Sequence, residues 1–226
     1  MEQEQNIHKA PPIGPDCRTR FTIRRLEAGP NVSEAAIRPI LDLSNLIFDT
    51  ARSPPTHHSS IEVWRQRLSP PPPQSGLPAP ILVYATATEG SKSDSSSSTS
   101  NNDPTGHNDH VGSPVGQDQV GSPPIGFIFA IPRTDSDPSI PSPTLHIWLA
   151  GVSEQARGTG VFAALMAEVE QHARRDENES RVKVMSVCTY PKRFGKMFAI
   201  LQRQGWEIRQ WLEDGEKVLF VKGLGV

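Results

Sequence analysis

Two glycines lie where an apolar stretch of the chain gives way to an amphipathic one. The segment Gln155-Ala156-Arg157-Gly158-Thr159-Gly160 follows an apolar run that ends at Val152, and residues 161–173 continue with helical spacing of apolar side chains. Glycine lets a backbone approach a ligand closely, and the first amides of a helix have no earlier carbonyl to bind. Anions are therefore favoured at such a helix start. The loop predicts a site for a pyrophosphate-bearing cofactor, held by the amides of residues 156–160.

Two common phosphate-binding motifs do not account for this loop. A nucleotide P-loop needs a lysine directly after its last glycine, and Val161 stands there instead. The letters of a dinucleotide-binding turn are present at 158–163. However, five residues separate the strand end at Val152 from Gly158, where that motif needs a tight turn. In the loop itself, Arg157 can add positive charge and Thr159 a hydroxyl.

The elements that must position this loop predict a mixed α/β domain of α+β character. Apolar runs and alternation indicate strands, and apolar residues three and four apart indicate helices. The expected strands are 21–24, 81–87, 125–131, 145–152, 181–188, 206–211 and 217–222, and the expected helices are 33–48, 61–68, 161–173 and 191–204. Pro39 requires either a kink in the first helix or a start near Arg38. Because several connections are hairpins, we expect a mostly antiparallel sheet of six to seven strands flanked by about four helices.

Composition indicates one domain with segments that do not fold. Of the 226 residues, 35% are hydrophobic and 22 are proline, which is a low apolar content for a compact domain. Residues 1–19 are expected to be a flexible tail and residues 20–226 a single domain. A serine-rich, low-complexity stretch at about 88–124 is expected to be a disordered insertion between two strands, and residues 132–143 a second flexible link.

Charge and cysteine content exclude several classes of protein. The net charge of −2 gives no basic signature for nucleic acid or a membrane surface. No apolar run approaches the roughly 18 residues of a membrane span. The N-terminus has no apolar run typical of a secretory signal, and two cysteines predict no disulfide framework, so we expect an intracellular, cytoplasmic or nuclear protein. His57-His58 and the His107–His110 stretch lack cysteine partners, so no metal site is predicted.

The loop in its context resembles a family signature. Residues 155–160 match the Gln/Arg-x-x-Gly-x-Gly/Ala signature of the GNAT superfamily of acetyl-CoA-dependent N-acetyltransferases, and they lie between a strand and an amphipathic helix as in that family. The order of elements along residues 20–223 is also similar. The resemblance implies the GNAT fold, acetyl-CoA as co-substrate, and transfer by direct attack of a primary amine in a ternary complex. Polyamines, aminoglycosides, amino acids and protein amines stay open as acceptors, and so does the oligomeric state.

The resemblance also implies how the cofactor is held. The strand backbone around Leu149, Ala150 and Val152 is expected to pair with the pantetheine arm, and an amide near Leu149 or Ala150 to bind the thioester oxygen. A bulge, which Gly151 would suit, is expected to splay this strand from its neighbour. Side chains at 145, 147 and 149 should face one way and those at 146, 148 and 150 the other. The expected cofactor contacts of the loop are Gln155, Ala156, Arg157, Gly158, Thr159 and Gly160.

Proton-transfer groups follow from the same resemblance. Some family members carry a general-base glutamate six residues before the last strand residue. Counting back from Val152, His146 stands there, and an imidazole can serve as such a base. The acid is often a tyrosine four residues before a Gly-Phe pair, and here Leu201 precedes Gly205-Trp206. Tyr190 and Thr189 are the nearby candidates. The missing tyrosine leaves a CoA-binding protein without turnover as an alternative. A more distant one is a scaffold that acts through its proline- and serine-rich segments.

Overall fold

Seven strands form one mixed sheet in a computed structural model, which describes residues 20–29, 32–48, 60–88, 122–133, 140, 143–175 and 182–225. The strands are β1 (Phe21–Glu27), β2 (Ile81–Ala87), β3 (Pro124–Pro132), β4 (Thr144–Val152), β5 (Val184–Thr189), β6 (Glu207–Leu212) and β7 (Lys217–Gly223). Their spatial order is β1-β2-β3-β4-β5-β7-β6. Every neighbouring pair is antiparallel except β4 and β5. The predicted mixed, mostly antiparallel sheet is confirmed.

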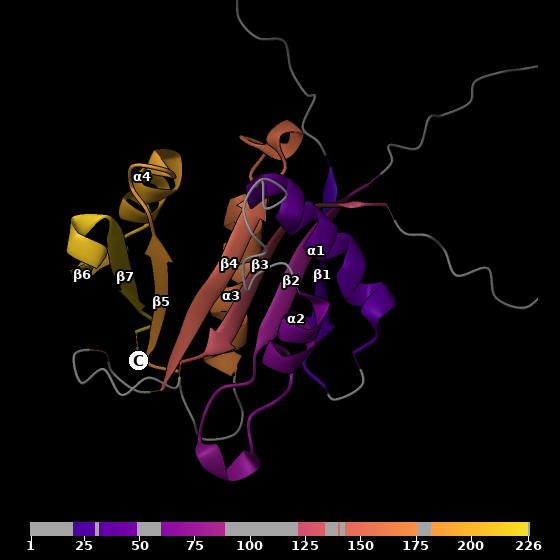
Figure 1. The fold of residues 1–226 in the computed structure, drawn as a ribbon, viewed down its shortest axis with the longest axis horizontal. Coiled ribbons are helices and arrows are strands. Elements are labelled where there is room, and N and C mark those ends of the chain that lie inside the picture. Colours follow the sequence, from indigo (N-terminus) through magenta and orange to yellow (C-terminus); the bar gives the residue numbers. More distant parts are fainter. Residues whose placement is uncertain are drawn as a thin grey trace, which may run out of the picture.

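Helices cover both faces of the sheet. They are α1 (Glu34–Phe48), α2 (Ile61–Arg67), α3 (Val161–Arg175) and α4 (Gly195–Arg203). In Figure 1, α1 and α2 lie in front of the sheet and α3 behind it. The core is correspondingly divided, with one buried cluster against α3 and α4 that includes Leu165 and Phe220. The other cluster lies against α1 and α2 and is centred on Trp64, whose ring lies 5.2 Å from that of Phe129.

One helix start agrees with the sequence expectation and another differs from it. α1 begins at Glu34, directly after Ser33, whose Oγ accepts a hydrogen bond from the Ala36 amide at 3.3 Å. This cap fixes the start, so a helix beginning near Arg38 is wrong, and α1 runs through Pro39. α4 begins at Gly195, later than the expected 191. The residues before it form a turn instead, in which the Phe194 amide donates to the Tyr190 carbonyl at 2.7 Å.

The ends of the predicted insertion meet at one end of the sheet. Thr86 near the end of β2 pairs with Pro124 at the start of β3. Residues 89–121, most of the expected insertion, lie outside the described residues, as do the tail 1–19 and residues 134–139 and 141–142 of the second link. The histidine pairs at 57–58 and 107–110 also lie outside them. Within the described part of the chain, no helix combines the length and apolarity needed to cross a membrane.

Candidate active site between β4 and β5

The two parallel strands at the centre of the sheet pair over only part of their length. Residues 144–147 of β4 pair with residues 184–187 of β5, and the pairing stops there. Beyond that point β5 pairs only with β7 among the described residues. Figure 1 shows β4 and β5 diverging toward their C-terminal ends. Residues 148–152 of β4 therefore keep one edge whose amides and carbonyls can bind an extended ligand as an added strand would.

A β-bulge at Trp148 accompanies this divergence. On the other edge of β4, Phe129 pairs with Leu149 and Ala130 pairs with Ile147, so the register shifts by one residue at Trp148. One extra residue on one strand bends that strand and increases its twist. The bulge lies at the residue where pairing with β5 ends. The predicted bulge is present on this strand, but its position is Trp148.

Gly151 has a packing role instead of the expected role in the bulge. It is buried, and a Cβ built on it would lie 2.8 Å from Cδ1 of Ile47 in α1. The bulge also changes the predicted alternation of side chains. Leu149 packs on the α1 and α2 side, whereas Ala150 packs with Ile147 on the α3 side. The expectation that Leu149 shares a face with Ile147 is wrong, because the extra residue reverses the order of faces.

The glycines of the loop adopt backbone conformations that other residues rarely take. Gly158 and Gly160 have φ values of +79° and +89°, in or beyond the left-handed region that favours glycine. A Cβ at either position would meet nothing within 4 Å, so the backbone there is also open to a ligand. Thr159 lies between them, and its Oγ1 donates to the Ala156 carbonyl at 2.7 Å. The loop is thereby held in shape just before α3 begins.

Part of the predicted set of amide donors is already used within the loop. The Ala156 amide donates to the Ser153 carbonyl at 3.1 Å, and the Arg157 amide to the Glu154 carbonyl at 3.2 Å, in a short 3-10 turn. The expectation that these two amides lack an acceptor is therefore wrong for this conformation. Within the described residues, the amides of positions 158, 159 and 160 make no backbone hydrogen bond. These three amides and the first turn of α3 remain the donors for an anion.

The other residues of the loop are mostly exposed. Gln155 and Arg157 face solvent, whereas Ala156 is buried against the α3 side of the sheet. The Arg157 Nε donates to the carbonyl of Val152 at 3.4 Å, which ties the loop to the end of β4. This contact keeps a guanidinium beside both the open strand edge and the glycine amides.

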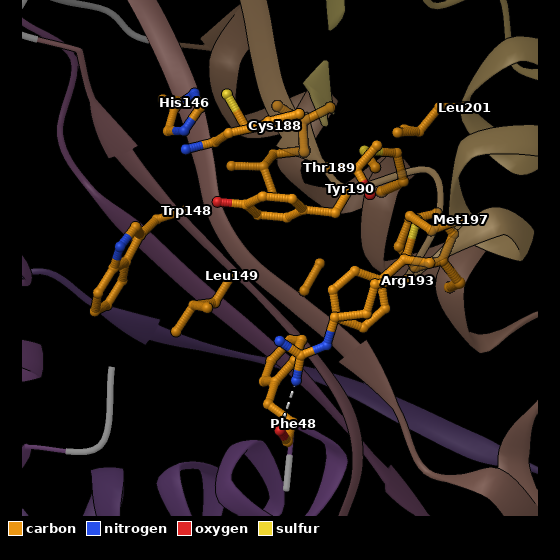
Figure 2. Close-up of a pocket in the computed structure, with 17 residues that line it drawn as sticks. Phe48, His146, Trp148, Leu149, Cys188, Thr189, Tyr190, Arg193, Met197 and Leu201 are labelled. Carbon is orange, nitrogen blue, oxygen red and sulfur yellow. Dashed lines mark hydrogen bonds between the residues drawn. The ribbon is translucent and has the colours of Figure 1, made fainter. Parts of the chain in front are cut away.

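A cleft of about 400 Å³ opens where β4 and β5 diverge. One part of its wall belongs to the core against α3 and α4, and we call it the apolar half: Ile147, Ala150, Phe162, Met166, Val187, Met197 and Leu201. The rest is mostly aromatic, polar or charged, and we call it the polar half: Phe48, His146, Trp148, Leu149, Cys188, Thr189, Tyr190, Arg193, Phe194 and Lys217. Figure 2 shows labelled residues of both halves around this cleft. Its volume lies within the range of small-molecule sites.

The structure brings the predicted catalytic residues to this cleft. His146, Thr189 and Tyr190 all line it, together with Leu149 and Ala150 of β4. His146 is half-buried, and its Nδ1 lies 2.9 Å from Oγ of Ser186, a fully buried residue of β5. This hydrogen bond orients the imidazole across the last paired segment of β4 and β5. Leu201, which stands where a tyrosine is often found, is buried in the apolar half.

Tyr190 belongs to a network that the sequence did not indicate. Its hydroxyl donates to Oε2 of Glu213 at 2.9 Å, and Nζ of Lys217 donates to Oε1 of the same carboxylate at 3.1 Å. The Lys217 ammonium lies 5.5 Å from the centre of the Tyr190 ring. In the sequence, Glu213 belongs to the hairpin signal Glu213-Asp214-Gly215, and Lys217 begins the expected strand 217–222. Turn signals describe local geometry, and no pattern in the sequence pairs this turn with Tyr190, the residue that follows β5.

Burial and this network shift several pKa values. The pKa of Tyr190 is raised, first by burial and then by its hydrogen bond to Glu213. The pKa of Glu213 is lowered by its hydrogen bonds from Lys217 and Tyr190. Burial lowers the pKa of Lys217, but the hydrogen bond to Glu213 and nearby charges outweigh it, so that pKa is raised. Burial also raises the pKa of the Cys188 thiol, so this side chain is a neutral wall of the cleft near pH 7.

Contacts between α1 and the segment before α4 limit the cleft on one side. The Phe48 and Phe194 rings meet edge to face, with centroids 6.0 Å apart. Nη2 of Arg193 donates to the Phe48 carbonyl at 3.2 Å, which Figure 2 marks with a dashed line. Nothing in the sequence indicated Phe48 or Arg193 as a site residue. It joins segments 145 residues apart in the chain, so only the fold reveals it.

Comparisons with known proteins agree with this architecture. The model of the acetyltransferase (GNAT) family matches residues 84–192, from β2 to the turn after β5. A search of curated proteins found no significant sequence match.

Solved structures share the fold at low sequence identity. Ard1 from Thermoplasma volcanium is 14% identical with a TM-score of 0.51, over 91% of this chain and 99% of that chain. Arabidopsis thaliana NAA60 in complex with acetyl-CoA is also 14% identical with a TM-score of 0.51, over 90% and 98%. AAC(6')-Iy in complex with a CoA-linked bisubstrate analogue is 16% identical with a TM-score of 0.53, over 86% and 95%. The match to the family model places residues 84–192 in the GNAT acetyltransferase family. The solved structures add that the chain shares their fold.

Proposed function

We propose that this protein transfers an acetyl group from acetyl-CoA to a primary amine by direct attack in a ternary complex. One observation carries the proposal. The unpaired edge of β4 begins at a bulge, leads to a glycine loop with positive φ values, and opens into a cleft lined by His146 and Tyr190. These features give one continuous path for phosphates, an extended arm and a reacting carbonyl. Family membership supports the same class of reaction.

The residues on this path fit acetyl-CoA. In our proposal the amides of Gly158, Thr159 and Gly160 bind the pyrophosphate, Arg157 adds positive charge, and Gln155 and Ala156 complete the loop. The backbone of Leu149, Ala150 and Val152 pairs with the pantetheine arm, and the apolar half of the cleft accommodates its thioester end. The fold relatives NAA60 and AAC(6')-Iy were solved with acetyl-CoA and with a CoA-linked analogue, which supports this choice of ligand.

Acetyl-CoA supplies an acetyl group activated as a thioester. The amine nitrogen forms an amide bond to the acetyl carbon while the bond from that carbon to sulfur breaks. One proton leaves nitrogen and one is gained by sulfur, so the reaction is balanced. His146 accepts the proton from the amine, because an imidazole changes its charge near neutral pH. Tyr190 or Thr189 provides the proton for sulfur or holds the water that does so, and a backbone amide near Leu149 or Ala150 stabilises the carbonyl oxygen.

A second candidate is a protein that binds acyl-CoA without turning it over. The observation in its favour is Leu201, a buried aliphatic residue where many members of the family have a tyrosine acid. A thiolate is a better leaving group than an alkoxide and can depart without a strong proton donor. Loss of the tyrosine therefore argues for slower acetyl transfer more than for its absence.

The test begins with the cofactor. Acetyl-CoA at saturating concentration should raise the melting temperature of the wild-type protein, since a ligand stabilises the state that binds it. The gain should vanish in Gly158→Glu, whose carboxylate would occupy the anion site. Gly76→Glu is a matched control, because Gly76 is also an exposed glycine with a φ of +64° and open space around it, on the turn after Pro73–Ser75. It should keep the gain.

Release of free CoA in the presence of a panel of primary amines then separates the two candidates. Amine-dependent release that falls at least tenfold in His146→Ala supports transfer with His146 as base. Stabilisation by acetyl-CoA without release for any amine identifies the binding protein. No stabilisation at all would reject both readings.

A further inference from the structure

The polar half of the cleft carries fixed positive charge. Arg193 and Lys217 both line it, and the guanidinium of Arg67 lies 4.4 Å from the ring centre of Trp148, another residue of this wall. None of the described residues that line the cleft is an aspartate or a glutamate. An amine acceptor is itself cationic before it loses its proton. It therefore meets a wall that repels it unless it brings negative charge of its own.

Among the described residues, the carboxylate that contacts this wall is that of Glu213, and it is already engaged. Glu213 accepts hydrogen bonds from both Tyr190 and Lys217, and these bonds lower its pKa, so it stays ionised and balances a single cation. The charge of Arg193 is not balanced in this way. Among the described residues, its guanidinium donates from Nη2 to the Phe48 carbonyl, which is a neutral acceptor. The cations of the wall therefore outnumber its carboxylates even when Glu213 is counted.

Both cations keep N–H groups that their present contacts do not use. An ammonium has three donors, and Lys217 directs one toward Glu213. A guanidinium has five donors in a planar fork, and Arg193 uses Nη2 toward the Phe48 carbonyl. Carboxylate oxygens are the acceptors that match such donors best, because charge-assisted hydrogen bonds are the stronger ones.

Aromatic rings form the remainder of this wall. Phe48 and Trp148 line the cleft and Phe194 joins them through its contact with Phe48. These rings can pack against an apolar group. To a second ammonium they offer only a cation–π contact with a ring face. The wall thus combines donors for an anion with a surface for an apolar side chain.

Resting on the proposed acetyl transfer, we infer that the acceptor is an amine that carries both a carboxylate and an apolar side chain, as an apolar α-amino acid does. Lys217 and Arg193 recognise the carboxylate, and the rings of Phe48 and Trp148 accommodate the side chain. The amine then lies toward His146 and the open edge of β4. Polyamines and aminoglycosides, which carry several ammonium groups, are excluded by the same charges.

The test compares amines that differ in one group. L-Phenylalanine and phenethylamine share the ring and the amine, and only the first has the carboxylate. Spermidine represents polycationic acceptors. We expect kcat/KM for CoA release to be at least about tenfold higher with L-phenylalanine than with phenethylamine at equal free-amine concentration, and spermidine to be the poorest. In Lys217→Met, Arg193→Met or the double variant, the ratio of L-phenylalanine to phenethylamine should fall about tenfold while stabilisation by acetyl-CoA is kept.

A binding measurement keeps this inference separate from the proposed transfer. With CoA present, L-phenylalanine should raise the melting temperature more than phenethylamine does, whether or not any acetyl group is transferred. Such a preference without turnover supports the acceptor class and rejects catalysis. Equal or better binding and turnover of phenethylamine or spermidine rejects the acceptor class. A preference for the carboxylate that survives in the double variant also rejects it, because the two cations would then not be its cause.

Discussion

At the scale of single residues, a strained turn holds a negatively charged carboxylate beside the cleft. Glu213 and Asp214 have φ values of +50° and +53°, which residues other than glycine rarely adopt. Strain of this kind persists where the surrounding structure holds it, and here Tyr190 and Lys217 both bind the Glu213 carboxylate. The turn between β6 and β7 thus does more than reverse the chain. It fixes a carboxylate beside a phenol that is a candidate for proton transfer.

The titration of Tyr190 should report this network. The chain has only two tyrosines, so Tyr84→Phe leaves Tyr190 as the single phenol. Its pKa, measured by ultraviolet absorbance, should lie above the ordinary value of about 10, and Glu213→Gln should bring it back toward that value. Since the folded state holds the proton more tightly, the network stabilises the fold below the unfolded pKa. This contribution is lost as pH rises through the folded pKa.

Asp214→Asn provides the control for that titration. It removes the same charge from the adjacent residue, which is exposed and shares the unusual φ. An equal shift in Asp214→Asn would mean that the general charge of the turn, and not the hydrogen bond from Tyr190, raises the pKa.

At the scale of elements, α1 packs closely on β4 at Gly151, which has no side chain. Gly151 lies in β4 directly under Ile47 of α1, and a Cβ there would lie within 2.8 Å of Ile47 Cδ1 and 3.2 Å of its Cγ2. Because Ile47 is followed by Phe48, which lines the cleft, this contact sets how close the end of α1 lies to the site. Packing of the helix against the strand therefore bears on the shape of the acceptor wall.

Gly151→Ala should destabilise the protein by about 1–3 kcal/mol, as overpacking of a well-filled contact does. Ile47→Val removes Cδ1, the atom that the new Cβ would meet most closely, so the double variant should recover at least half of the loss. Urea unfolding of the four proteins gives the coupling free energy between the two positions. Strictly additive effects would show that α1 does not constrain this glycine.

The sequence predicted those parts of the site that depend on local rules. The two loop glycines were identifiable because positive φ and a strand-to-helix junction leave a mark within a few residues. The bulge was placed at Gly151 because glycine suits bulges, but register depends on pairing with β3, which put the extra residue at Trp148. The start of α4 was set at Pro191, a good first helical residue. Instead, a hydrogen bond from Phe194 to Tyr190 keeps these residues in a turn.

At the scale of the whole molecule, only part of the site lies within the match to the family model. The family model covers residues 84–192, which include the loop, β4 and β5. Phe48, Arg67, Arg193, Glu213 and Lys217 all lie outside that range. The features that hold the cofactor in our proposal lie within the matched residues. The cations that would select an acceptor lie outside them, which is why the sequence signature indicated a donor and no acceptor.

Replacing residues 89–121 by a linker of about eight residues should leave this domain intact. β2 and β3 are antiparallel neighbours, and Thr86 pairs with Pro124, so a short connection can join them. Shortening the loop about fourfold lowers the entropic cost of bringing its ends together, which should stabilise the fold by about 1 kcal/mol. The melting temperature and its rise with acetyl-CoA check this expectation. A large loss of either would mean that the replaced residues contribute to the fold or the site, as the scaffold alternative would allow.

The bulge at Trp148 has a consequence for how this site can evolve. The open edge of β4 depends on the number of residues in this strand, because the extra residue lies where the pairing with β5 ends and bends the strand there. Many side chains can stand at position 148 without altering that count. A deletion of a single residue there would remove the bulge and with it the bend of β4, although Leu149 and Ala150 would keep their pairing with β3 and their present faces. The site should therefore tolerate substitution at this point far better than any change in length.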